Sequence, residues 1–236
     1  MKKRNRGGCS KGRIRTIAGF TGVAGLLTAI ALAAGVVLGT PSLVLIGLPE
    51  RAQEPIVAPL FQNPEFPSGC EAFSLAMCLR SMGYSVEPSE LIDVYMPTDP
   101  TGSDYVDCYA GDARGSGSAM PPALVACTDA YATATDAPLH GVELTGCSFD
   151  ELTEVVERGY PVLTWVTTDM EPPVLSDTAM RGYRLYRNFH CVLLYRIQGG
   201  VACIADPLVG LTEHDARSFQ TLWEECGRLV MTVRES

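Results

Sequence analysis

Three residues of this chain, Cys70, His190 and Asp206, could together perform nucleophilic catalysis. The four residues from 68 to 71, SGCE, precede an apolar run over 72–79. Serine followed three residues later by glutamate is typical of a capping box, which predicts that a helix begins here. Cys70 would then lie in the first turn, where the helix dipole favours a thiolate and free backbone N–H groups can bind an oxyanion. The alternative is a buried structural cysteine that falls near a helix start.

The histidine best placed to serve as a base is His190, which opens a β-rich run over 190–195. A Gly-Gly pair at 199–200 predicts a turn, and a second apolar run then leads to Asp206. In the resulting hairpin His190 and Asp206 lie at the same end, where the carboxylate could accept an imidazole N–H and leave the other ring nitrogen for a thiol. His214, by contrast, lies in a polar stretch typical of a solvated loop. The alternative for the pair is a core histidine and a turn aspartate.

Together these motifs resemble the papain-like cysteine peptidases that process bacteriocin leader peptides, and especially their secreted or membrane-anchored single-domain bacterial relatives. The resemblance rests on GCEA at 69–72, NFHCVLL at 188–194 and IADPL at 204–208. It extends over roughly residues 56–232 and includes QNPEFPSGC at 62–70, GYPVLTWV at 159–166 and FQTLW at 219–223. It implies that Cys70 is the nucleophile, His190 the general base and acid, and Asp206 the orienting carboxylate.

One departure from the family pattern concerns the oxyanion hole. Papain-like enzymes usually place a glutamine about six residues before the nucleophile, whereas Gln62 lies eight residues before Cys70. Pro64 and Pro67 intervene and could shape a longer loop that still delivers the amide. The resemblance assigns Gln62 to the oxyanion hole, with Asn63 as the neighbouring candidate. The alternative is that Gln62 only packs, and that the backbone N–H of Cys70 acts with another donor.

The N-terminal segment predicts a membrane anchor. Seven lysines and arginines precede an uncharged stretch over 17–49, and its apolar part, 17–39, is long enough to cross a bilayer as one helix. The basic flank favours a cytoplasmic N-terminus and an extracellular catalytic domain. The alternative is a protein secreted after signal cleavage near Ala34. The predicted domains are a cytoplasmic tail (1–16), a transmembrane helix or uncleaved signal anchor (17–39), a linker (40–58) and a papain-like peptidase domain (59–236).

Charge and cysteine content limit the partners. The net charge is −9, and seven of the 18 lysines and arginines lie in the N-terminal tail. The rest of the chain is therefore strongly acidic, which argues against nucleic acid as a partner. Nine cysteines in an extracellular protein favour disulfides. Cys108 and Cys147 are the better candidates, with unknown partners, and Cys191 and Cys203 could face each other across the hairpin. No paired Cys/His spacing indicates a metal site, and no cofactor is expected.

The remaining elements predict a single α+β domain in which the nucleophile helix packs on an antiparallel sheet. Helices are expected over 88–95, 122–132, 148–159 and 218–226, and further strands over 161–166 and 229–233. The Gly-, Ser- and Asp-rich segment 98–122 is expected to be either a functional loop or mobile.

The predicted function is thiol-dependent hydrolysis of peptide bonds outside the cytoplasm, with a peptide or protein as substrate. Two alternatives remain open: a cell-wall peptide hydrolase or transpeptidase with the same triad, and a catalytically inactive papain-like binding domain. The absence of a P-loop motif excludes an exporter fused to this chain. The sequence does not indicate an oligomeric state.

Overall fold

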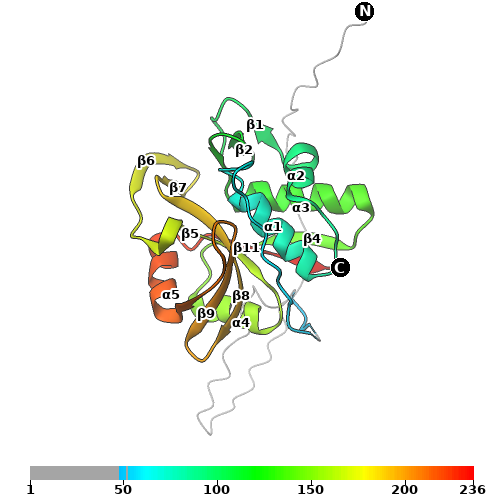
Figure 1. Ribbon diagram of the computed structural model, residues 1–236, viewed down its shortest axis with the longest axis vertical. Coiled ribbons are helices and arrows are strands. Elements are labelled where there is room, and N and C mark those ends of the chain that lie inside the picture. The colour runs from blue at the N-terminus through cyan, green and yellow to red at the C-terminus, as the bar shows by residue number, and fades with distance from the viewer. Residues whose placement is uncertain (1–47, 52) are drawn as a thin grey trace, which may run out of the picture. The chain divides into compact units, whose positions relative to one another are not determined.

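A six-stranded sheet forms the centre of the computed structural model, which describes residues 48–51 and 53–236. Its strand order is β10-β9-β8-β5-β11-β4, and every neighbouring pair is antiparallel (Figure 1). In chain order the strands are β4 (Leu139–Glu143), β5 (Val162–Thr167), β8 (Phe189–Gln198), β9 (Val201–Asp206), β10 (Gly210–Asp215) and β11 (Val230–Glu235). The predicted α+β class and antiparallel sheet are therefore confirmed.

Helices cover both faces of this sheet. The first face carries α1 (Cys70–Ser81) and α3 (Pro121–Thr135), and the second carries α4 (Phe149–Glu157) and α5 (Ala216–Glu225). Side chains of a strand alternate between faces, so Leu193 of β8 packs with the first pair of helices and Val192 and Leu194 pack with the second. Both faces are buried, which explains why the 190–195 run is apolar throughout rather than alternating.

The helix predicted at 148 begins with the capping box that its sequence indicates. The backbone N–H of Glu151 donates to Ser148 Oγ at 3.3 Å, and the Ser148 N–H donates to Glu151 Oε2 at 2.7 Å. The predicted helix over 88–95 is also present, as α2 (Pro88–Glu90) followed by a wider helical turn over Leu91–Tyr95.

Removing the Ser148 cap should destabilise the fold by about 1 kcal/mol. The Glu151 N–H loses its acceptor, and the Glu151 carboxylate, which accepts the Ser148 N–H, loses its hydrogen bond from the Ser148 hydroxyl. We expect Ser148→Ala to lower the free energy of unfolding in urea by this amount. The exposed Ser116 supplies the matched control, because Ser116→Ala makes the same change of residue type outside a helix cap. Equal unfolding free energies for the two variants would contradict the capping box.

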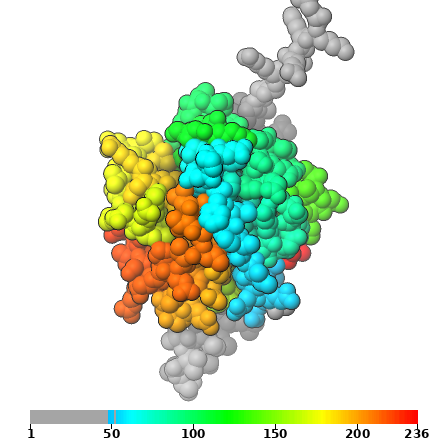
Figure 2. Space-filling model, viewed as in Figure 1, coloured from blue at the N-terminus to red at the C-terminus, as the bar shows by residue number. Residues whose placement is uncertain are grey.

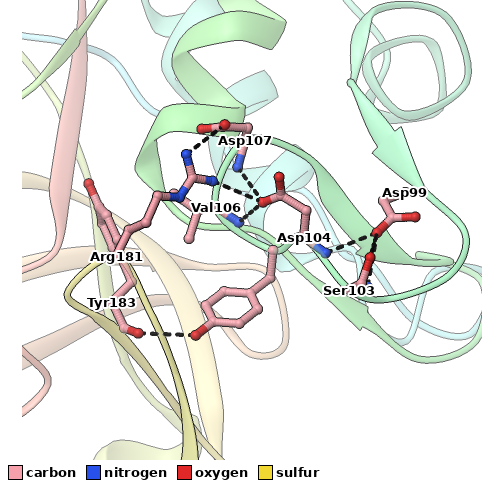
Figure 3. A network of polar contacts seen from close by, with 8 residues as sticks. Asp99, Ser103, Asp104, Val106, Asp107, Arg181 and Tyr183 are labelled. Carbon is pink, nitrogen blue, oxygen red and sulfur yellow. Dashed lines mark hydrogen bonds and ion pairs between the residues drawn. The ribbon is translucent and has the colours of Figure 1, made fainter. Parts of the chain in front are cut away.

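Two smaller sheets were not predicted from the sequence. One comprises β1 (Thr98–Asp99), β2 (Tyr109–Gly111) and β3 (Gly117–Ser118), and the other is the hairpin of β6 (Leu175–Met180) and β7 (Tyr183–Tyr186). Arg181, at the tip of this hairpin, binds Asp104 at 3.1 Å and Asp107 at 2.7 Å (Figure 3). Asp99 accepts hydrogen bonds from Thr101, Ser103 and Asp104. The segment 98–122 is thus fastened to the hairpin by side-chain contacts.

The stretch around His214 is an edge strand rather than the solvated loop that its polarity suggests. It belongs to β10, which pairs with β9 on one side only. Most of its side chains are exposed or half-buried, so polar residues are compatible with a strand here.

The eight described cysteines are all free thiols, so the predicted disulfides at Cys108 and Cys147 are wrong. Cys203 lies opposite Arg196 in the β8–β9 register, which separates it from Cys191 at the other end of the hairpin. The register of the hairpin therefore rules out the bridge that the two flanking cysteines suggested.

No helix within residues 48–51 and 53–236 is long and apolar enough to cross a membrane. The tail predicted at 1–16 and the span predicted at 17–39 lie outside the described residues, as does Cys9.

Candidate active site

The helix that carries Cys70 begins as predicted, but not with a capping box. Gly69 is the N-cap residue, and Ser68 Oγ donates to the carbonyl of Gly115 at 3.0 Å instead of capping the helix. Glu71 is buried, and its Oε1 accepts the backbone N–H of Ala119 at 2.9 Å. A Cβ at position 69 would lie 2.9 Å from Phe66 Cβ, so this tight entry to the helix requires glycine. The capping-box prediction is therefore wrong at this helix.

The Cys70 thiol is buried, with 6% of the residue exposed, and it donates to Glu71 Oε2 at 3.2 Å. Burial, followed by the neighbouring charge of Glu71, raises the pKa of this thiol well above its ordinary value of 9.0. A backbone hydrogen bond from Cys191 opposes these effects only in part. Burial and the neighbouring carboxyl therefore act on this thiol in the opposite direction to the helix dipole, which by itself favours the thiolate.

His190 and Asp206 lie together at one end of the hairpin, as predicted. Both are buried, and His190 Nε2 is 2.7 Å from Asp206 Oδ1. The same oxygen accepts the backbone N–H of Leu208 at 2.7 Å. Burial raises the pKa of Asp206, but the His190 hydrogen bond and charge and the Leu208 N–H together outweigh it, so the pKa lies below 3.8. An ionised Asp206 holds the proton on Nε2 and leaves Nδ1 as an acceptor.

Helix α1 packs directly on strand β8, which carries His190. Cys191, the residue after His190, contacts the Cys70 sulfur through its backbone, and its carbonyl accepts a hydrogen bond from Ser74 Oγ at 3.1 Å. The charge of His190 also acts on the neighbouring carboxyl of Glu71. The first turn of α1 and the first residues of β8 therefore meet at the same end of the sheet.

Gln62 lies beside this end of the sheet despite its greater distance from Cys70 in the sequence. Its backbone N–H donates to the carbonyl of Pro207 at 3.0 Å, directly after Asp206. Figure 2 shows the corresponding blue-to-cyan segment alongside the orange surface of the hairpin. The buried side chain donates from Nε2 to the carbonyl of Pro67 at 2.9 Å, while its Oε1 has no partner among the described residues. Asn63, the other candidate, is exposed.

The model of the Peptidase_C39-like family matches residues 56–231. The chain belongs to this family. C39-like members are cysteine peptidases, which are hydrolases, and this is the class of the chain. The fold agrees, because a putative C39-like peptidase from Bacillus anthracis superposes with a TM-score of 0.64 at 22% identity, covering 78% of this chain and 99% of that one.

Two further solved structures match the chain more weakly. The peptidase domain of Streptococcus ComA, a bifunctional ABC transporter involved in quorum sensing, gives a TM-score of 0.49 at 14% identity over 77% of this chain and all of that one. A double-glycine-motif protease from an AMS/PCAT transporter, solved with its leader peptide, gives 0.48 at 16% identity over 80% and 98%. A search of curated proteins found no match.

Sequence reasoning missed two residues at this C39-like site. Glu71 was assigned to a helix cap, although an acidic residue at the head of an otherwise apolar helix was a signal that it is buried against a partner. The Tyr109 hydroxyl donates to the carbonyl of Ser68, two residues before Cys70, and no pattern indicated this contact. Within the described residues no group of three or more His, Cys, Asp and Glu could hold a metal ion.

The Asp206 carboxylate should make the free energy of unfolding of this C39-like domain depend on pH in the acid range. Its pKa is lower in the folded than in the unfolded chain, so its contribution is fully present above 3.8 and is lost as the pH falls through the lower folded value. We expect the unfolding free energy of the wild type to fall more steeply than that of Asp206→Asn over this range. Urea unfolding of both proteins at several pH values below about 5 measures this difference. Parallel curves for the two proteins would contradict it.

Proposed function

We propose that the chain hydrolyses peptide bonds with Cys70 as nucleophile, His190 as general base and acid, and Asp206 as the orienting carboxylate. The observation that carries this proposal is the buried His190–Asp206 hydrogen bond at the end of the strand on which the nucleophile helix begins. Membership of the C39-like family supports peptide bonds as the substrate class.

The geometry supports a two-step mechanism. His190 Nδ1 takes the thiol proton while the Cys70 sulfur attacks the carbonyl carbon, and Asp206 stabilises the imidazolium that forms. The proton then passes to the leaving amine, and a thioester remains on Cys70. Water, deprotonated by His190, hydrolyses this thioester and restores the thiol. Cys70 is the first residue of α1, so its N–H has no intrahelical acceptor and can bind the oxyanion.

We assign the second oxyanion donor to Gln62. One hydrogen of its Nε2 is used by the Pro67 carbonyl, and the other is left for a substrate oxygen. The side chain lies on a loop that is hydrogen-bonded to the residue after Asp206, which supports a place beside the catalytic pair.

Alkylation by an epoxide inhibitor tests the assignment of the nucleophile. An inhibitor that binds like a peptide should label Cys70 ahead of the seven other described thiols, because in the proposed mechanism His190 activates Cys70 alone. Peptide mass spectrometry after partial reaction identifies the labelled cysteine. Labelling that is equally fast in Cys70→Ser, or no labelling of Cys70 at all, would contradict the proposal and favour a binding domain.

We further propose that the domain acts outside the cytoplasm and is held at the membrane by residues 17–39. The seven basic residues before this apolar segment support an N-terminus inside the cell. Such a domain would meet cell-wall peptides or exported proteins. Protease added to intact cells should digest the C-terminal domain and spare an N-terminal tag. A protected domain, or a mature chain in the medium beginning near Ala34, would contradict anchoring.

A further inference from the structure

Glu71 is a buried acidic residue that the proposed mechanism does not use. It is 1% exposed, and each of its carboxyl oxygens has one partner. Oε1 accepts the backbone N–H of Ala119 at 2.9 Å, and Oε2 lies 3.2 Å from the Cys70 sulfur. Glutamate is almost never fully buried without a partner, and here that partner is the nucleophile itself.

We propose that Glu71 is a positioning residue that holds the Cys70 thiol protonated in the free enzyme and sets the pH at which the thiolate forms. This inference rests on the proposed role of Cys70 as nucleophile. At rest the S–H bond is intact and points to Glu71 Oε2. On activation the S–H bond breaks, the proton passes to His190 Nδ1 and the electron pair stays on sulfur. Glu71 keeps its charge and its bond to Ala119 throughout.

The sulfur and the carboxyl share a single proton, and two effects place it on the sulfur. The ordinary pKa values are 4.5 for the carboxyl and 9.0 for the thiol, so the carboxyl is the stronger acid. Burial raises the pKa of both groups, and hydrogen bonds from Ala119, from the Glu71 N–H and from Cys70 oppose it at the carboxyl without cancelling it, so the pKa of the carboxyl is also raised. The 3.2 Å contact between the Cys70 sulfur and Oε2, together with the lower ordinary pKa of a carboxyl, supports thiol and carboxylate as the resting pair, whose two members titrate together.

Few other charges surround the pair. The titratable groups on neighbouring strands are His190 and Cys191 of β8, Asp206 of β9 and Tyr109 of β2. Among these only His190 can carry a positive charge, and Asp206 is already bonded to it. The charge of Glu71 is therefore the nearest negative charge to the thiol, and its removal should act on Cys70 directly.

The carboxyl is fixed in place by a second chain of contacts. Ala119 donates its N–H to Glu71, and its carbonyl accepts the indole N–H of Trp165 at 2.9 Å. Trp165 is fully buried in β5, so the junction between β3 and α3 is held on the central sheet. Glutamine at position 71 can still accept from Ala119 but lacks the negative charge. Glu71→Gln thus separates the effect of the charge from the effect of the shape.

The pH dependence of Cys70 alkylation by iodoacetamide tests this inference, because the small neutral reagent reports the thiolate without any substrate. We expect Glu71→Gln to lower the midpoint by about 1 to 3 pH units, the effect of removing an adjacent like charge. Glu71→Asp keeps the charge and should keep a midpoint close to that of the wild type. We compare the midpoints of the pH profiles rather than the alkylation rates, because a thiolate with a lower pKa is also a weaker nucleophile.

Two outcomes would overturn the inference: an unchanged midpoint in Glu71→Gln, and equal shifts in Glu71→Gln and Glu71→Asp. If Glu71→Gln folds poorly, carbon-13 NMR of the side-chain carboxyls supplies the reciprocal test. Cys70→Ala removes the thiol hydrogen bond, so the pKa of Glu71 should rise; an unchanged value overturns the inference. Alkylation requires no peptide cleavage, so a protein that shows the shift but cleaves no peptide would refute the proposed function alone.

Discussion

Replacing Cys70 by alanine is expected to abolish peptide hydrolysis and to leave the fold intact. Without the sulfur no thioester can form, and what remains is the weak catalysis of an oxyanion hole and a binding site. Loss of a nucleophile of this kind lowers kcat by roughly four to six orders of magnitude. Cleavage of a casein-type or peptide substrate, followed by mass spectrometry, measures the loss.

The matched control is Cys78→Ala, two turns further along the same helix. Cys78 is also a fully buried thiol, but its sulfur faces the carbonyl of Pro161. We expect this variant to lose some stability and to keep its activity per folded molecule. Equal losses of activity in the two variants would indicate that packing, and not the nucleophile, is responsible.

Asp206→Asn should lower kcat by roughly two to four orders of magnitude without unfolding the domain. Asparagine lacks the negative charge that stabilises the imidazolium, and where its amide donates to His190 Nε2 the ring proton moves to Nδ1, which then cannot accept the thiol proton. His190→Ala should lose still more, because no base remains. Steady-state kinetics of both variants, normalised to folded protein, test this expectation.

Asp177→Asn provides the control for this pair, because Asp177 is an exposed aspartate on β6. It removes the same charge from the chain and should leave kcat unchanged. Full activity in Asp206→Asn would contradict its role as the residue that orients His190.

The hairpin of β8 and β9 could be predicted because its signals are local. A buried strand, a Gly-Gly turn and a second strand ending at Asp206 bring the two polar residues together whatever surrounds them. Helix α1 was predictable for the same reason, since residues 72–79 are apolar except for Ser74.

Glu71 could not be assigned from the sequence because a distant contact determines its position. The pattern SGCE satisfies the capping-box spacing, yet the carboxyl binds Ala119, which lies 48 residues further along the chain. The cysteines were misjudged for a related reason. Their number suggested disulfides, but all eight described cysteines are free, and the register of β8 and β9 separates Cys191 from Cys203.

Gln62 illustrates what the spacing of a motif leaves open. The sequence showed only that it lies further from Cys70 than the family resemblance implies, whereas in the structure its backbone N–H donates to the carbonyl of Pro207, the residue after Asp206. The edge strand β10 was missed because a strand paired on one side tolerates the polar residues of a loop.

Trapping the acyl-enzyme tests the central claim most directly. Reaction with a cleavable peptide, quenched in acid within the first turnover, should leave the N-terminal part of the peptide attached to the protein as a thioester. Mass spectrometry of the digested protein should place the added mass on the peptide that contains Cys70, and Cys70→Ala should show none. Continued cleavage with the adduct on another residue, or with the same rate in Cys70→Ala, would contradict catalysis by Cys70.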